Sequence, residues 1–267
     1  EKVRVIFAMT GGAFGGKEDY PTNLAGYVAL LSWKANGQPV KMVYSRQEDL
    51  LVTTKRHPSV TYVKSAFNKD GKLIGLKIDT ILEGGAYVTL SPVVLSRGVL
   101  HSFGPYSCPN VNVRGRAVFT NSVPYGAFRG FGAPQTIFAL ERHIDQAAHK
   151  LGIDPYELRK LNLLYANDTM ATGQEMTSDP NLEEIVSKAI KESNYKKKIK
   201  EYAIFNQRNA KVKKGIGLSL FFHGAGFTGS GEVFMASKAG LRAKTDGTVE
   251  VLTAQTEMGQ GIHTTLS

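Results

Sequence analysis

The sequence predicts a mixed α/β (α+β) fold, because segments with the alternating pattern of strands lie between segments with the spacing of amphipathic helices. Three glycine-rich loops, each at a predicted strand-to-helix junction, favour the same class. A hydrophobic fraction of 42% and a charged fraction of 21% are typical of a globular chain with a sizeable core. The length of 267 residues allows one large domain or two of ordinary size.

The N-terminal part of the sequence predicts one helix among several strands. The helix, residues 23–34, has apolar side chains at Leu24, Val28, Leu31 and Trp33. The turn sequence Asn-Lys-Asp-Gly at residues 68–71 joins two of the strands into a hairpin. The predicted strands are residues 3–8, 40–44, 59–67, 73–83 and 111–119.

The rest of the sequence predicts further helices and a second hairpin. Apolar spacing predicts helices at residues 134–151, 155–164 and 181–208, the last of them highly charged. Strand-like sequence resumes at Ile216. Asp246-Gly247 predicts a hairpin turn between residues 240–244 and 248–253.

These elements predict two units and a connector. The first unit covers residues 1–165, a helical connector covers residues 166–213, and a second, β-rich unit occupies residues 214–267. The first predicted strand starts without a cap, and the sequence stops at Ser267 within a new helix. We therefore expect the fold to be incomplete at both ends.

Composition and charge limit the class of protein. The net charge of +10 favours anionic ligands or acidic partner subunits. The lysines at 196–198 and around 211–214 lie in an aromatic-poor helical stretch, so we expect a solvated face and no nucleic acid. The sequence lacks the roughly 18-residue apolar run that a membrane span needs, and its start does not have the pattern of a secretory signal. We expect no membrane association.

Cysteine usage indicates a reducing compartment. Cys108 is the single cysteine, so no internal disulfide and no cysteine cluster for zinc or iron–sulfur binding can form. We expect Cys108 to be buried and inert, and we expect the protein to be cytoplasmic.

The first glycine-rich loop, residues 11–18, has the sequence GGAFGGKE. Glycines let backbone N–H groups approach an anion or a flat ligand closely, and a following helix adds a favourable dipole. The spacing of Gly11, Gly16 and Lys17 also fits a nucleotide-binding P-loop. A P-loop would continue with Ser or Thr to hold magnesium, whereas here Glu18 would repel phosphate.

The second loop, residues 125–135, has the sequence YGAFRGFGAPQ and comes just before a predicted helix. Arg129 offers a planar set of donors suited to an oxyanion or a phosphate. The third loop, residues 256–261, has the sequence TEMGQG, in which Gln260 can both donate and accept at the edge of a heterocycle. Together the three loops predict a cradle for a large polar cofactor.

The three loops resemble those of the molybdenum-binding subunit of the xanthine dehydrogenase and aldehyde oxidase family. They are similar to the family's GGxFGGKE, AFRGFGxPQ and EMGQG loops in order and interval, and the resemblance covers essentially the whole chain. It implies a molybdopterin-binding domain of the xanthine dehydrogenase type. It also implies a molybdenum–molybdopterin cofactor, either as molybdopterin or as its cytosine dinucleotide.

The resemblance implies positions for the cofactor-binding residues. Phe14 and Gly15 would lie beside the metal. Ala127, Phe128 and Arg129 would line its other side, and Gly259 and Gln260 would contact the cofactor from the second unit. No side chain would bind the metal directly.

The resemblance also implies a substrate pocket of the purine-hydroxylating type. Glu18 ends the first loop, and Arg97 lies thirty-two residues before Arg129, as in purine-hydroxylating members. Phe131 and Phe227 would stack on the two faces of a flat ring. Glu18 and Arg97 would bind its opposite edges, and Arg97 would stabilise negative charge that develops on the ring. Alternatively, Glu18 caps the next helix and Arg97 belongs to a surface ion pair.

Several parts of such an enzyme are not on this chain. In the family, a glutamate base lies far beyond the third loop, and a glutamine that bonds the metal's oxo group lies before the first. We expect both to come from the remainder of the molybdenum subunit, and the iron–sulfur and FAD centres to come from partner domains or subunits. We expect Glu257 to order its own loop rather than act as the base.

The resemblance implies an oxidoreductase of purine catabolism that uses water-derived oxygen to hydroxylate xanthine or hypoxanthine, with this chain alone inactive. A nicotinate-type heterocycle or an aldehyde is the alternative substrate within the family. A nucleotide-binding module or a non-catalytic scaffold is the alternative of another class.

Overall fold

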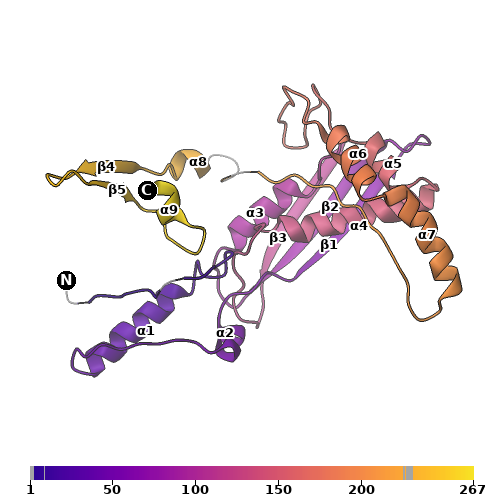
Figure 1. Ribbon diagram of the computed structural model, residues 1–267. Helices are drawn as coiled ribbons and strands as arrows, with labels where there is room; N and C mark the ends of the chain where they lie inside the picture. Colours follow the sequence, from indigo (N-terminus) through magenta and orange to yellow (C-terminus); the bar gives the residue numbers. More distant parts are fainter. Residues whose placement is uncertain (1–2, 9, 225, 227–230) are drawn as a thin grey trace.

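A three-stranded sheet forms the centre of the computed structural model, which describes residues 3–8, 10–224, 226 and 231–267 (Figure 1). The strand order is β1-β2-β3. β1 (Ser59–Phe67) pairs antiparallel with β2 (Leu73–Gly85) through the predicted turn, and β2 pairs parallel with β3 (Val111–Phe119). Because a parallel pair needs a crossover connection, α3 (Ser91–His101) carries the chain from β2 to β3.

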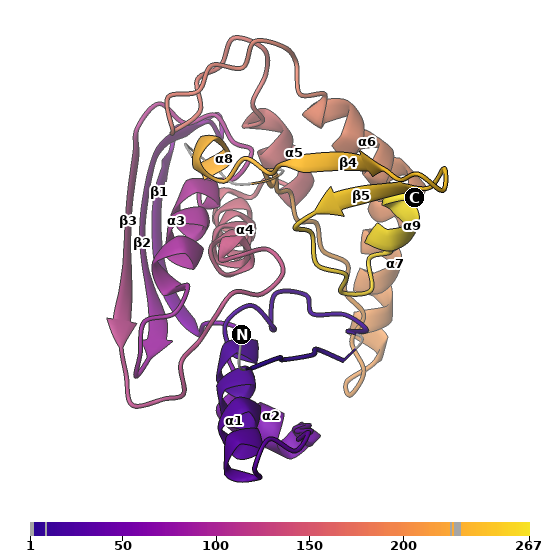
Figure 2. The same cartoon turned by 90° about the vertical axis from the view of Figure 1, so that its left-hand side faces the viewer.

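Two helices cover one face of this sheet. α3 and α4 (Ala133–Leu151) pack against each other and against the strands (Figure 2). Leu140, Ile144 and Ala148 of α4 are buried at the three-to-four-residue spacing of a helix face. They join Leu76 and Ile78 of β2 in one apolar cluster. This layer of strands and helices confirms the predicted mixed α/β class.

Most of the predicted elements are present within one to three residues of their expected bounds. They include the three strands of the sheet and α4, together with α1 (Pro21–Lys34), α5 (Pro155–Leu161), β4 (Ala239–Ala243), β5 (Val249–Thr253) and α9 (Ile262–Leu266). The predicted charged helix is two helices, α6 (Leu182–Glu192) and α7 (Tyr195–Arg208). They are separate because Asn194 between them has a left-handed backbone, with φ of 54°.

The strands predicted at residues 3–8, at residues 40–44 and from Ile216 are wrong, since none of these segments has strand structure. Apolar residues alone do not make a strand, because its backbone groups need a paired neighbour. Ile6 is 75% exposed and Val43 is 72% exposed, so neither segment packs its side chains as a core strand does. The segment after Ile216 instead places Leu218 and Leu220 against a core of helices.

Three helices were not predicted, namely α2 (Arg46–Val52), α3 and the short α8 (Gly231–Phe234). α2 begins with a capping box, in which Ser45 Oγ accepts from Glu48 N and Ser45 N donates to Glu48 Oε2 at 2.7 Å. This S-x-x-E signal was present in the sequence. α3 begins with proline in its first turn, which tolerates the missing N–H.

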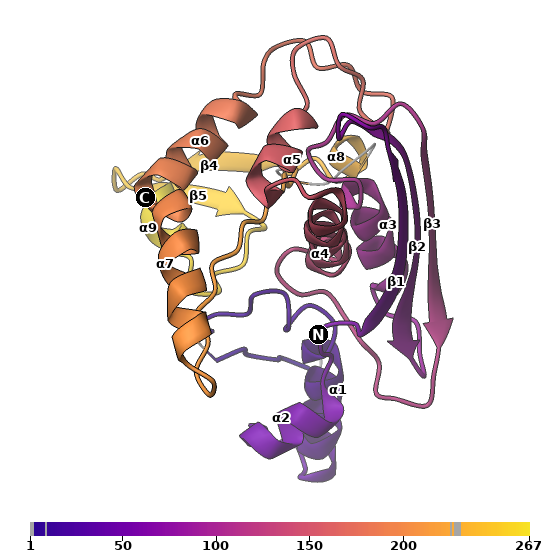
Figure 3. The same ribbon diagram turned by 90° about the vertical axis from the view of Figure 1, so that its right-hand side faces the viewer.

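Two parts of the chain stand apart from the sheet (Figures 1 and 3). One consists of α1 and α2, and α1 has no buried residue. The other is the β4–β5 hairpin, every residue of whose first strand is exposed. Trp33 of α1 is 70% exposed and Leu241 of β4 is 74% exposed. None of the described helices combines the length and apolar character of a membrane span.

The predicted buried, inert cysteine is half-buried. Cys108 packs against the main apolar cluster, and its Sγ lies 3.5 Å from the carbonyl oxygen of Asn110. Burial raises the pKa of the Cys108 thiol, although its hydrogen bond to Asn110 lowers it. The thiol is therefore held in its less reactive protonated form.

A buried ion pair ties three segments together. The Arg159 side chain on α5 is fully buried, and its Nε donates to Glu141 Oε2 on α4 at 2.9 Å. Arg159 Nη1 bonds Asp145 Oδ1 at 2.8 Å. The same Glu141 carboxylate accepts from the Tyr106 hydroxyl at 2.5 Å and from the backbone N of Leu220 at 2.8 Å. The donors to this buried carboxylate come from α5, from Tyr106 and from Leu220, so it fastens residues 216–224 onto α4 and α5.

Removal of the Arg159 charge is expected to destabilise the fold strongly. Arg159→Met leaves a buried carboxylate without its cation, which costs about 3–5 kcal/mol. Urea unfolding followed by circular dichroism measures the loss. Arg116→Met is the matched control, because Arg116 pairs with Asp79 at 3.0 Å at a partly exposed site, where a pair contributes about 0–1 kcal/mol. Equal losses for the two variants would contradict the role of burial.

Candidate cofactor site

The first and second glycine-rich loops touch through their backbones. Arg129 N donates to the carbonyl oxygen of Phe14 at 2.8 Å. A Cβ added to Gly15 would lie 2.8 Å from Ala127 O and 2.8 Å from the Cα of Phe128, closer than real side chains allow. Gly15 also has φ of 93°, a conformation that favours glycine. The two loops can therefore meet only with glycine at this position.

Arg56, which was not predicted as a site residue, holds the second loop in place. Arg56 Nη2 donates to the carbonyl oxygen of Arg129 at 2.7 Å, and its guanidinium lies 6.0 Å from the centre of the Phe128 ring. The Phe128 ring in turn lies against Gly16, where an added Cβ would be 2.9 Å away. Arg56 lies in a polar segment without glycines or regular periodicity, so no signal in the sequence pointed to it.

The third loop comes next to the first. A Cβ on Gly259 would lie 3.2 Å from Gly12 N, so backbone again faces backbone. Glu257 orders this loop as predicted, since its carboxylate accepts from Gly259 N at 2.7 Å, Gly261 N at 3.2 Å and His263 N at 3.3 Å. These backbone hydrogen bonds lower the pKa of Glu257. The carboxylate is thus fully engaged within its own loop.

Gln260 uses both ends of its amide inside the same loop. Its Oε1 accepts from Met258 N at 2.6 Å and its Nε2 donates to Thr256 O at 2.7 Å. Each end of the amide keeps one further lone pair or N–H for a ligand. These bonds hold the Gln260 side chain in place within the loop.

The loop backbones are unusual at two phenylalanines. Phe14 has φ of 53° and Phe131 has φ of 52°, in the left-handed region that bulky residues rarely adopt. Each lies next to glycines that also have positive φ. Such conformations cost about 1–3 kcal/mol and persist where the surrounding structure holds them.

Glu18 closes the first loop but does not cap a helix. α1 begins at Pro21 with Tyr20 as its N-cap and has no acidic residue in its first turn. Partial burial raises the pKa of the Glu18 carboxyl, and the charge of Asp19 raises it further. A carboxyl of this kind is protonated over a wider pH range than an ordinary glutamate.

Arg97 is buried between α3 and the segment that follows Ile216, and is not part of a surface ion pair. It is only 9% exposed. Its guanidinium lies 6.0 Å from the centre of the Phe131 ring. Nη1 lies 3.3 Å from Gly224 O and 3.3 Å from His223 Nε2, and Nη2 bonds Gly226 O. The structure thus brings together Arg97 and Phe131 of the predicted pocket, whereas Phe227 lies outside the described residues.

The loops fit a large polar cofactor better than a nucleotide phosphate. Their meeting surfaces are backbone, held close by Gly15 and Gly259. The exposed Arg129 guanidinium has no hydrogen-bond partner among the residues that the structure describes, which leaves its donors for an anionic group. The Lys17 ammonium, which a P-loop would present to phosphates, donates to Gly12 O of its own loop at 2.9 Å.

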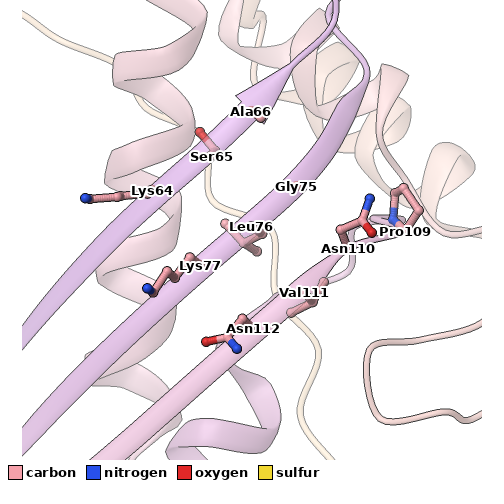
Figure 4. A pocket seen from close by; sticks show the side chains of 10 residues that line it. All are labelled: Lys64, Ser65, Ala66, Gly75, Leu76, Lys77, Pro109, Asn110, Val111 and Asn112. Atoms are coloured by element: carbon pink, nitrogen blue, oxygen red, sulfur yellow. The ribbon is translucent and has the colours of Figure 1, made fainter.

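A surface depression of about 590 Å³ lies elsewhere, on the outer face of the sheet (Figure 4). The small residues Ala66 and Gly75 leave it hollow, and Lys64, Lys77 and Asn112 surround them. None of its lining residues belongs to the three loops. It is therefore separate from the candidate cofactor site.

Comparison with known families gives the class of the protein. Two family models, each described as a molybdopterin cofactor-binding domain, match residues 1–163 and 188–267. Between them they include all three glycine-rich loops. The fold and the loops thus define a protein that binds a molybdopterin cofactor.

Individual relatives narrow the class to one family. The chain is 36% identical over 262 residues to a probable xanthine dehydrogenase subunit from Bacillus subtilis, with 98% of the chain and 34% of the relative covered. It is 41% identical over 188 residues to the nicotinate dehydrogenase large molybdopterin subunit of Eubacterium barkeri, covering 70% of the chain and 44% of the relative. The aldehyde oxidoreductase structure from Desulfovibrio gigas matches with a TM-score of 0.79 at 35% identity, covering 95% of the chain and 27% of that structure.

The chain belongs to the molybdenum hydroxylase family of xanthine dehydrogenases and aldehyde oxidoreductases, as its loops predict. Its homologues are oxidoreductases. The chain spans about a third of the length of the Bacillus subtilis relative.

Gly15→Ala is expected to reduce cofactor retention. The new methyl group would meet Ala127 and Phe128 and would force an unfavourable φ, and a cost of about 1.4 kcal/mol already lowers an affinity tenfold. We expect the molybdenum content of the purified protein, measured by mass spectrometry, to fall about tenfold or more on this basis. Gly11→Ala is the control, because nothing lies within 4 Å of its added Cβ. Full molybdenum loading of Gly15→Ala would contradict the proposed cradle.

Proposed function

We propose that the protein to which this chain belongs hydroxylates a purine, such as xanthine or hypoxanthine, with oxygen derived from water. The observation that carries this proposal is the position of Arg97, whose buried guanidinium lies over the Phe131 ring beside the second loop. Glu18 ends the first loop, whose backbone bonds the second loop through Phe14 and Arg129. A flat ring with polar edges suits this combination of aromatic face, cation and carboxyl.

The three loops would hold the molybdenum–molybdopterin cofactor, as molybdopterin or its cytosine dinucleotide. Phe14 and Gly15 of the first loop, with Ala127, Phe128 and Arg129 of the second, would approach it mainly by backbone groups and one guanidinium. Gly259 and Gln260 would contact it from the third loop. When bound, this cofactor supplies the redox centre that takes up the two electrons of the hydroxylation.

The substrate would lie between Phe131 and Phe227. The Glu18 carboxyl, whose pKa burial and Asp19 raise, can donate a proton in a hydrogen bond to a ring nitrogen or oxygen. Arg97 can stabilise negative charge on the opposite edge. We propose that the chain divides into units 1–165 and 214–267 with a connector 166–213, so that Phe227 would come from the second unit and the other pocket residues from the first.

Other components would complete the enzyme. The base that activates the water and the group that bonds the oxo ligand belong to the remainder of the molybdenum subunit. Iron–sulfur and FAD centres on partner domains or subunits would carry the electrons away. We propose a cytoplasmic enzyme of purine catabolism, in which this chain alone is inactive.

A nicotinate-type heterocycle is the second candidate substrate. The Eubacterium barkeri relative with 41% identity is named a nicotinate dehydrogenase subunit, and an arginine such as Arg97 also suits a carboxylate. An aldehyde is a weaker candidate, because a simple aldehyde makes little use of both Glu18 and Arg97.

Turnover of hypoxanthine, nicotinate and benzaldehyde by the complete, cofactor-loaded enzyme tests the proposal. We expect hypoxanthine to be turned over fastest. Glu18→Ala is expected to lower kcat/KM for hypoxanthine about 10- to 100-fold, the effect of losing a hydrogen bond of about 1.5–3 kcal/mol. The value for benzaldehyde should change little. Asp19→Asn controls for the loss of a neighbouring negative charge.

Faster turnover of nicotinate than of hypoxanthine would favour the second candidate, a nicotinate-type heterocycle, as the substrate. Turnover of benzaldehyde alone would keep the family and refute the roles of Glu18 and Arg97.

A further inference from the structure

His101 of α3 has a defined hydrogen-bonding role on each side of its ring. Its Nδ1 lies 2.8 Å from the carbonyl oxygen of Arg97, four residues earlier in the helix. A carbonyl oxygen only accepts, so Nδ1 carries the hydrogen. On the other side, Gly224 N donates to His101 Nε2 at 3.1 Å. Nε2 must therefore have a free lone pair, and the arrangement holds only for the neutral ring.

His223 stacks on His101 and connects Arg97 to the second loop. The two rings are 5.0 Å apart with an angle of 25° between their planes. His223 Nε2 lies 3.3 Å from Arg97 Nη1 and 3.2 Å from the carbonyl oxygen of Gly130. With a lone pair, Nε2 accepts from Arg97. With a hydrogen, it donates to Gly130 instead, so this atom cannot satisfy both neighbours at once.

The surroundings of His101 favour the neutral form of its ring. The groups that face this ring and the stacked His223 ring are the Arg97 guanidinium and carbonyl from α3, the Gly130 carbonyl from the second loop, and the Phe222 ring and Gly224 from the second unit. No carboxylate contacts either ring among the residues that the structure describes. Burial lowers the pKa of His101, the Arg97 carbonyl raises it, and the charges of His223 and Arg97 lower it again.

We propose that the neutral His101 ring, with His223 stacked on it, positions the Arg97 guanidinium for substrate, and that protonation of His101 releases Arg97 and weakens substrate binding in acid. Protonated His101 loses the acceptor for Gly224 N, so the segment that holds Arg97 through the Gly224 and Gly226 carbonyls separates from α3. Both histidines are positioning residues, and the inference rests on the proposed substrate role of Arg97.

Equilibrium binding of a purine inhibitor that is not turned over, measured by calorimetry on the complete enzyme, tests this inference. Protonation of a histidine with a lowered pKa begins below its ordinary value of 6.5. We therefore expect Kd to increase as the pH falls below 6.5. Glu18 and groups elsewhere in the enzyme also titrate, so the readout is the difference between variants over the same pH range.

Two substitutions separate position from protonation. His101→Gln retains an acceptor for Gly224 N and a donor for Arg97 O but does not titrate. It is expected to bind like the parent at pH 8 and to lose part of the acid weakening. His101→Ala removes both bonds and is expected to raise Kd about tenfold at pH 8, which corresponds to about 1.4 kcal/mol. His223→Gln tests the partner ring.

His143→Gln is the matched control, because burial lowers the pKa of His143 as well, but His143 bonds Ser65 on β1 and not Arg97. Its binding profile should equal that of the parent. Identical pH profiles for the parent and His101→Gln would overturn the inference. Arg97→Gln separates the two proposals, since an unchanged Kd in that variant refutes the substrate role of Arg97 itself. A raised Kd in Arg97→Gln with normal binding in His101→Ala refutes only the role of the histidines.

Discussion

The close backbone contact at Gly15 is the constraint on which the rest of the site depends. The loop that precedes α1 and the loop that precedes α4 are more than a hundred residues apart in sequence, yet they lie within hydrogen-bonding distance, with Arg129 N on the Phe14 carbonyl. No side chain fits between them. Arg56 holds the second loop from the opposite side. The cofactor cradle is therefore assembled by tertiary contacts, and each loop alone would not define it.

A second glycine contact positions α3, the helix that carries the predicted substrate-binding residue Arg97. Gly132 at the start of α4 lies directly against the carbonyl of Val94 on α3, and Gly98 packs against the backbone of Gly132 in return. This contact brings α3 against the second loop, which puts Arg97 over Phe131. The sheet supports the arrangement because α3 is the crossover between β2 and β3. The fold thus links the two sides of the site through small residues rather than through long polar side chains.

The three loops, the family and most elements of the core could be predicted from the sequence, because each is encoded by a local pattern of residues. Glycine spacing, the Asn-Lys-Asp-Gly turn and the periodicity of α4 are all short-range signals. Most of the failures are long-range, although α2 was missed despite the local S-x-x-E signal at its start. Whether residues 3–8 and 40–44 form strands depends on a partner strand, and the roles of Arg56, His101 and His223 depend on segments far away in the sequence. Glu257 was predicted correctly, since its partners are in its own loop. The hydrogen bonds of Gln260 to Met258 and Thr256 were not predicted, because an exposed amide can bond a ligand as readily as its own loop.

The fastening of residues 216–224 by Glu141 has a consequence for how such a protein can evolve. Ile216, Leu218 and Leu220 pack on the helices that follow α4, and Phe222 packs on the main core beside the sheet. The backbone N–H of Leu220 also donates to the buried carboxylate of Glu141 on α4. A recombination between family members anywhere from α7 to Ile216 would join this segment to a foreign core. The largely exposed stretch of residues 171–179, before α6, bonds its near neighbours in sequence and can vary more freely in length. Exchange of the C-terminal unit as an independent module is thus restricted to crossover points beyond Phe222, where the first two loops and Arg97 are already fixed by the recipient.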